Sequence, residues 1–237
     1  MNVQIVLFNG FDELDAIAPH EIWQMARELK SGLEVQLVTL DGPTGITASN
    51  GLRVQAQGQL GTKKPDIVVV PGGGWITRSP AGAWAEAQRG ALPAKLAELH
   101  RDGTIMTSVC TGAMLLAAAG LLKNRPATTN HGAFEELTAA GAKLVRARVV
   151  DDGDVVTAGG ITCGMDLTLW LVERFIGAES AHALEGQLEY ERRGTVWRSE
   201  HAWKLEVRRR IAEIEKGEVQ EIPGDEVSER VRKIVNR

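Results

Sequence analysis

Cysteine is scarce in this chain, since Cys110 and Cys163 are the only two among 237 residues. Two cysteines without clustered histidines do not form a zinc site and are too few for a disulfide scaffold. An excess of one charge is also lacking, because 27 basic and 31 acidic residues give a net charge of −4. We therefore expect no metal site, and neither nucleic acid nor an anionic membrane as a partner.

Long hydrophobic runs are missing as well. No apolar stretch approaches the roughly 18 residues that a membrane-spanning helix requires. The start of the chain, MNVQIVLFNGFDELD, lacks the basic segment and cleavage site of a signal peptide. We therefore predict a cytoplasmic protein in which both cysteines are reduced thiols.

Short apolar, β-branched runs alternate with helical patterns over most of the chain. We predict strands at residues 3–8, 35–40, 52–54, 66–70 and 104–109, and helices at 19–29, 81–100, 111–122, 134–140 and 161–176. Two further strands, at 144–150 and 155–158, suit a hairpin. Strands that are apolar on both faces and alternate with helices predict an α/β fold, with a mostly parallel sheet covered by helices on both sides.

The composition changes near Tyr190. Residues 190–237 contain 12 basic and 10 acidic residues, so nearly half of this tail is charged. Apolar residues recur in it at helical spacing, at Trp203, Val207, Ile211 and Ile214, and again at Val227, Val231 and Ile234. We predict an α/β domain over 1–190 and a tail over 191–237 made of two amphipathic helices. These helices would pack on the body or on a dimer mate, or would dock another protein.

Cys110 follows the predicted strand 104–109 directly and precedes a predicted helix. In an open parallel sheet, ligands bind outside the carboxyl ends of the strands, and a strand–turn–helix junction there is the setting of a nucleophile elbow. A nearby helix start favours the thiolate, which is the reactive form of cysteine. The alternative is an inert buried thiol, and the sequence leaves the two nearly balanced.

Two other segments are predicted to reach the same edge. The loop PGGG follows the strand 66–70, and glycines such as Gly73 and Gly74 let backbone N–H groups approach a ligand. Asp12, Glu13 and Asp15 follow the first strand. Asp12 and Glu13 fit a solvated helix start, whereas Asp15 lies where the helix begins to be buried. A buried carboxyl group beside a thiol has a raised pKa and can carry a proton.

The blocks GFDELDAIAP, DIVVVPGGG, TSVCTGAMLLAAAGLL, ATTNHGAFEEL and TAGGITCGMDLTLWLVE, taken in order, resemble the ThiJ/PfpI superfamily. These proteins are relatives of class I glutamine amidotransferases, and the resemblance covers about residues 3 to 190. It implies a flavodoxin-like three-layer sandwich with the cysteine at a strand–helix nucleophile elbow. The segments LDAIAP and SVCTGA favour the isonitrile hydratase branch. Proteases of the superfamily carry histidine after the cysteine, where this chain has Thr111.

This resemblance implies a homodimeric enzyme that acts on a small molecule without a cofactor. Cys110 would be the nucleophile, Asp15 its acid/base partner, and the N–H groups of Thr111 and Gly73 would face the reacting centre together with Gly74. The implied reaction is the addition of water to an isonitrile, which gives an N-substituted formamide. The alternatives are another activity of the superfamily, namely glyoxalase, deglycase or peptidase, or a non-enzymatic small-molecule or oxidation sensor.

Four residues depart from the pattern of the superfamily or have ordinary roles. Many relatives have histidine directly after ATT, but this chain has Asn130 there and His131 one place later. We retain His131 as a candidate substrate-binding residue, with an ordinary loop role as the alternative. We interpret Cys163 as a packed thiol and Asp166 as a hydrogen-bonding residue at a helix start.

The tail has a resemblance of its own. Residues 203–235 are similar to the end of small addiction-module, antitoxin-like proteins, with a helix, a Gly-Ile-Pro segment and a second helix. This similarity implies a docking segment for a protein partner. A terminal helix pair of similar composition is the alternative.

Overall fold

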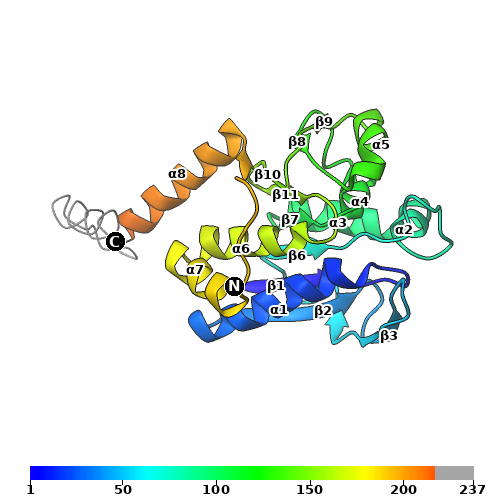
Figure 1. Ribbon diagram of the computed structural model, residues 1–237, viewed down its shortest axis with the longest axis horizontal. Coiled ribbons are helices and arrows are strands. Elements are labelled where there is room, and N and C mark those ends of the chain that lie inside the picture. Colours follow the sequence, from blue (N-terminus) through cyan, green and yellow to red (C-terminus); the bar gives the residue numbers. More distant parts are fainter. Residues whose placement is uncertain (217–237) are drawn as a thin grey trace.

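The computed structural model describes residues 1–216. Its centre is an eight-stranded sheet in which the only antiparallel neighbours are β10 and β11 (Figure 1). In spatial order the strands are β12 (Trp197–Arg198), β10 (Val149–Asp151), β11 (Val155–Ala158), β7 (Ile105–Ser108), β6 (Ile67–Val70), β1 (Asn2–Val6), β2 (Glu34–Thr39) and β5 (Gly58–Gln59). The predicted, mostly parallel sheet is therefore confirmed.

Helices cover the sheet in two groups, which makes three layers. One group packs together and consists of α1 (Glu13–Leu29), α6 (Cys163–Phe175) and α7 (Ala178–Gln187). The other consists of α2 (Ala83–Arg89), α3 (Ala91–Arg101), α4 (Gly112–Ala118) and α5 (Phe134–Ala139). This arrangement is the predicted flavodoxin-like sandwich. Within residues 1–216, no helix is long and apolar enough to cross a membrane.

The central strands are mostly apolar because both of their faces are buried. Every residue of β1 and β6 is buried, and their apolar side chains join one hydrophobic core with those of the flanking helices. Removal of this apolar surface from water is the main stabilising contribution to the sandwich. The four strands β11, β7, β6 and β1 are parallel neighbours, so the loops after them leave the sheet at the same edge.

Several of the predicted elements are wrong in extent, and helix α1, for example, begins at Glu13 rather than at residue 19. The single helix expected at 81–100 is two helices, because Gly90 adopts a left-handed conformation (φ 75°) that ends α2 before α3 begins. The strand expected at 144–150 is also divided. Only its end pairs with β11, whereas β9 (Lys143–Leu144) forms a separate small sheet with β8 (Pro126–Ala127). The weak strand near residue 53 is β4 (Arg53–Gln55), which pairs with β3 (Gly45–Thr47).

The tail begins as part of the body and continues into α8 (Glu200–Glu215). Strand β12 pairs with β10 at the edge of the sheet, and the face of α8 that carries Ala202 and Glu206 is buried. The predicted apolar face of this helix is exposed at Trp203, Val207, Ile211 and Ile214. The second helix predicted in the tail lies outside the described residues, and the division of the chain at residue 190 stays a prediction.

Candidate active site

Cys110 occupies a strained turn between β7 and α4. Its φ angle is 55°, in the left-handed region that residues with a side chain seldom adopt. Its N–H donates to the carbonyl oxygen of Gly159 at 2.7 Å, and its carbonyl oxygen accepts from the Thr129 hydroxyl at 2.9 Å. The neighbouring strands thus hold this conformation, which matches the sharp strand-to-helix turn of a nucleophile elbow.

Asp15 lies in the first turn of α1 and is fully buried. Its Oδ2 atom accepts from the Gly72 N–H at 2.9 Å, whereas Oδ1 has no hydrogen-bond partner among the described residues. Burial raises the pKa of Asp15 to about 8, and the charge of Asp12 acts in the same direction. The Gly72 N–H and the Cys110 thiol oppose this increase, which places the thiol beside the carboxyl group.

The Cys110 thiol is also difficult to ionise. Burial raises its pKa to about 12, and the nearby charge of Asp15 contributes, while the N–H groups of Ile161 and Thr111 favour the thiolate. The two groups are therefore coupled, and a charge on one opposes ionisation of the other. The pair therefore loses its first proton near pH 8, and the proton that remains is shared between the carboxyl group and the thiol.

Ile161 is a site residue that the sequence did not reveal. Its φ angle is 33°, which is a rare conformation for a β-branched residue. This geometry directs its N–H to the Cys110 sulfur, while its side chain is exposed. The conformation depends on the turn after β11, and no local pattern in GGITCG predicts it.

The N–H groups of Thr111 and Gly73, which we predicted as donors to the reacting centre, have different acceptors in the structure. The Thr111 N–H acts on the sulfur, whereas the Gly73 N–H donates to the Thr111 hydroxyl at 3.1 Å. Gly73 has a φ angle of 116°, and a Cβ atom there would lie 2.4 Å from the Gly10 carbonyl oxygen. Only glycine fits at this position, which fixes the PGGG loop, including Gly74, against the loop after β1.

His131 stands apart from the pair of Asp15 and Cys110. It is exposed at the start of a short 3-10 helix, η1 (His131–Ala133), and no hydrogen bond links it to Cys110 or Asp15 in residues 1–216. Its neighbour Asn130 lies close to Gly160, since a Cβ atom there would be 2.9 Å from the Asn130 amide nitrogen. The loop therefore borders the site, and the binding role of His131 stays a prediction.

Asp12 is less exposed than the solvated helix start that the sequence predicts. It is the N-cap residue of α1 and is only partly exposed, and burial raises its pKa. Its charge adds to the pKa shifts of both Asp15 and Cys110. Glu13 instead accepts hydrogen bonds from the N–H and the side-chain amide of Asn50.

Cys163 and Asp166 have structural surroundings. Cys163 is buried at the start of α6, where its sulfur packs 3.2 Å from the position of a Cβ atom on Gly159, and burial raises its pKa. Asp166 is buried and accepts from Arg148 Nε at 2.8 Å and from the Tyr190 hydroxyl at 3.1 Å. These contacts suit the packed thiol and the hydrogen-bonding carboxylate that we predicted.

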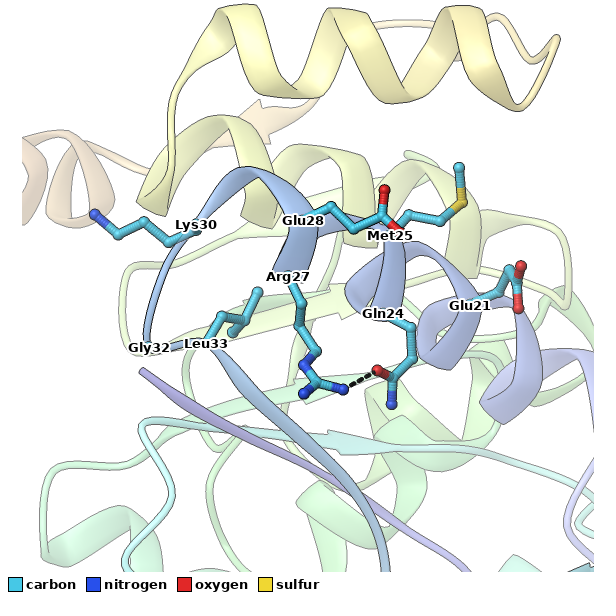
Figure 2. Close-up of a pocket in the computed structure, with 8 residues that line it drawn as sticks. All are labelled: Glu21, Gln24, Met25, Arg27, Glu28, Lys30, Gly32 and Leu33. Atoms are coloured by element: carbon cyan, nitrogen blue, oxygen red, sulfur yellow. Dashed lines mark hydrogen bonds between the residues drawn. The ribbon is translucent and has the colours of Figure 1, made fainter.

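The described residues contain no metal cluster, and the surface pocket of Figure 2 does not include Cys110. No group of three or more His, Cys, Asp or Glu side chains in residues 1–216 is arranged to hold a metal ion. The pocket lies along the second half of α1 and the turn that leads to β2, and the Arg27 guanidinium donates to Gln24 there at 2.7 Å (Figure 2). Most of the side chains that line it are charged or polar, and neither cysteine nor serine is among them.

Sequence comparisons find similar proteins over most of this chain. Isonitrile hydratase from Pseudomonas putida is 31% identical over 191 residues, which cover 80% of this chain and 78% of that protein. A deglycase from Pyrococcus horikoshii is 27% identical over 176 residues, covering 73% of this chain and 96% of the relative.

Solved structures share the same architecture. A ThiJ/PfpI family protein from Pseudomonas syringae has a TM-score of 0.71 at 26% identity, over 81% of this chain and 76% of that one. Drosophila melanogaster DJ-1beta has a TM-score of 0.69 over 81% of this chain and 98% of its own, and at 19% identity it shows the fold alone. The model of the DJ-1/PfpI family matches residues 1–174, and this chain therefore belongs to that family.

Proposed function

We propose that this protein is an enzyme of the isonitrile hydratase type, which adds water to an isonitrile and releases an N-substituted formamide. The observation that carries the proposal is the contact between Cys110 and a buried Asp15 whose pKa is raised to about 8. A carboxyl group with such a pKa can donate and accept a proton near neutral pH. The similarity to the Pseudomonas putida isonitrile hydratase supports this choice of substrate.

The first step forms a thioimidate. The pair reacts in its singly protonated form, with the thiolate on Cys110 and the proton on Asp15. The sulfur attacks the terminal carbon of the isonitrile, and Asp15 protonates that carbon, which gives a Cys110–S–CH=N–R adduct. The N–H groups of Ile161 and Thr111 favour the thiolate before attack.

The second step releases the product. The Asp15 carboxylate removes a proton from water as the oxygen adds to the thioimidate carbon, and it returns this proton to the nitrogen. Asp15 then accepts the hydroxyl proton while the carbonyl group forms and the C–S bond breaks. The products are the formamide R–NH–CHO and the starting thiolate with a protonated Asp15, so the net reaction consumes one isonitrile and one water.

The decisive experiment is an assay of formamide formation from p-nitrophenyl and cyclohexyl isocyanide. Wild type, Cys110→Ala and Asp15→Asn are compared at equal concentration, with Cys163→Ala as the matched cysteine control. We expect turnover in wild type and in Cys163→Ala, and none in the other two variants. Absence of turnover by wild type, with Cys110 still reactive toward a thiol reagent, would falsify the hydratase proposal and direct the assay to aldehyde substrates.

We further propose a cytoplasmic homodimer, on the grounds of the resemblance to the superfamily and the unpaired cysteines. The exposed apolar residues of α8 suit the contact of the tail with another protein. Light scattering on the full chain should give twice the 25.6 kDa mass of the monomer. A monomeric mass at micromolar concentration would contradict the dimer.

A further inference from the structure

Ile76 is an exposed apolar residue beside the candidate site. Its side chain is 58% exposed, and it lies two positions after Gly74 in the loop that follows β6. A Cβ atom on Gly132 would lie 2.5 Å from Ile76 Cδ1 and 3.3 Å from Cγ1. The absence of a side chain at Gly132 therefore makes room for Ile76, whose side chain extends from the PGGG loop to the loop that contains His131.

Both of these loops border Cys110. On one side, the Gly73 N–H donates to the hydroxyl of Thr111, the residue after the nucleophile. On the other side, the Thr129 hydroxyl donates to the Cys110 carbonyl oxygen, and the chain continues through Asn130 to Gly132. A side chain that connects these two loops therefore forms part of the rim around the thiol.

A group of four side chains fixes the segment that carries Ile76, and we call it the Arg78 cluster: Trp75, Arg78, Trp84 and Glu136. The Trp75 indole N–H donates to Glu136 Oε2 at 2.7 Å, and Arg78 donates to both oxygens of Glu136, at 2.8 and 3.1 Å. The Arg78 guanidinium also lies 3.9 Å from the centre of the Trp84 ring, and the Trp75 and Trp84 rings meet edge to face at 5.2 Å.

The Arg78 cluster joins the loop after β6 to α2 and α5. The Arg78 guanidinium makes two hydrogen bonds to the Glu136 carboxylate and stacks on the Trp84 ring. These contacts restrict its motion more than an isolated surface ion pair would. Arg78 itself has a φ angle of 52°, which turns the chain back after Ile76. Within the loop, the Arg78 N–H donates to the Trp75 carbonyl oxygen at 3.1 Å, so the turn that presents Ile76 is closed on itself.

We propose that Ile76 is a specificity-determining residue, an apolar wall that contacts the substituent of the molecule attacked by Cys110. Trp75, Arg78, Trp84 and Glu136 are positioning residues that hold this wall in place. The substrate class is accordingly a small electrophile with a compact aliphatic or aromatic substituent. The identity of that electrophile as an isonitrile rests on the proposed function, whereas the position of the wall does not.

The test uses two readouts of substituent size. The first is the ratio of kcat/KM for cyclohexyl and methyl isocyanide. The second is the ratio of rate constants for alkylation of Cys110 by N-cyclohexylmaleimide and N-methylmaleimide, followed by mass spectrometry of the Cys110 peptide. Ile76→Ala should lower both ratios about tenfold, because lost apolar contact weakens only the larger substituent. Ile211→Ala, a substitution at a 50% exposed isoleucine of α8, is the matched control and should change neither ratio.

The positioning role is tested separately with Glu136→Gln, which keeps the shape of the side chain but removes its charge. It should lower both ratios about threefold, in the same direction as Ile76→Ala. Glu98→Gln, which removes an exposed ion pair with Lys95 on α3, is its control. A change in the maleimide ratio without any isonitrile turnover would support the wall and refute the hydratase. Unchanged ratios for Ile76→Ala in a folded protein would overturn the wall itself.

Discussion

Two aspartates in this protein are equally buried but have opposite surroundings. Asp151, on β10, is fully buried and accepts from Trp170 Nε1 at 2.9 Å, from the Gly153 N–H at 2.8 Å and from the Arg174 guanidinium at 3.2 Å. Asp15 is also fully buried, but in residues 1–216 no cationic side chain pairs with it and one of its oxygens has no partner.

This difference separates a fully paired buried carboxyl group from an incompletely paired one. A buried charge is tolerated when an opposite charge and hydrogen bonds compensate it, as at Asp151. Without that compensation a carboxyl group retains its proton to a higher pH, as at Asp15. The comparison teaches that incomplete pairing, rather than burial, marks the carboxyl group that is available for proton transfer.

The largest expected effect is on activity. Asp15→Asn should lower kcat/KM for isonitrile hydration by about 10² to 10⁴, because the amide cannot exchange a proton with the thiol or the substrate. Its thermal stability should not fall by a comparable amount, since the variant removes an incompletely paired buried acid. A variant that keeps more than a tenth of the activity would place the acid/base function elsewhere.

The complementary substitution should affect stability. Asp151→Asn leaves the buried guanidinium of Arg174 without its carboxylate, and we expect a loss of about 3 kcal/mol or more in the free energy of unfolding. Urea denaturation monitored by circular dichroism measures it. The folded fraction should keep its activity, because Asp151 makes no contact with Cys110. An Asp151→Asn variant that is stable but inactive would show that Asp151, which we assign a structural role, is needed for the reaction instead.

The pH dependence of stability should also differ. Between about pH 4 and pH 8, the unfolded chain loses the Asp15 proton that the folded protein keeps, so this residue lowers the free energy of unfolding as pH rises. Asp15→Asn removes this effect. From pH 5 to pH 7 the free energy of unfolding of the variant should therefore rise by roughly 1 to 3 kcal/mol relative to that of wild type. Urea titrations at both pH values test it, with the exposed Asp41→Asn as control. If the free energies of unfolding of wild type and Asp15→Asn differ by the same amount at pH 5 and pH 7, the raised pKa of Asp15 is contradicted.

The activity of wild type should depend on the same pair. We expect kcat/KM to rise with pH through about 8, as the pair of Asp15 and Cys110 loses its first proton and the thiolate becomes accessible. The rate of Cys110 alkylation should follow the same curve. In Asp15→Asn this increase should move to another pH, and an unchanged curve would assign it to a different group.

The smallest effect is expected at the second cysteine. Cys163→Ala should retain activity within about twofold, and it should lose roughly 1 kcal/mol of stability, because the sulfur packs in a buried position near Gly159. The formamide assay and urea denaturation check both values. A loss of activity comparable to that of Cys110→Ala would show that the packed thiol takes part in the reaction.

Much of the sheet was predictable because its strands are continuous apolar runs. The strand before Cys110 and the helix after it were recognised from residues 104–122, and their position at the carboxyl edge follows from parallel topology. The division of the helix at Gly90 was missed, since one left-handed glycine ends a helix without changing the apolar spacing. The partner of the apolar face of α8 was left open between the body, a dimer mate and another protein, because spacing predicts an apolar face but not what covers it.

The sequence by itself determined the alternation of strands and helices and the neighbours of Cys110, because local propensity and apolar periodicity act over short distances. The sequence also predicted Asp15 as the partner of Cys110, but only the tertiary structure decided that Ile161 turns its N–H to the sulfur and that the Gly73 N–H donates to Thr111 beside this pair. These contacts join the ends of four different strands. Their pKa shifts and strain arise from burial and from distances across the fold, which no local pattern encodes.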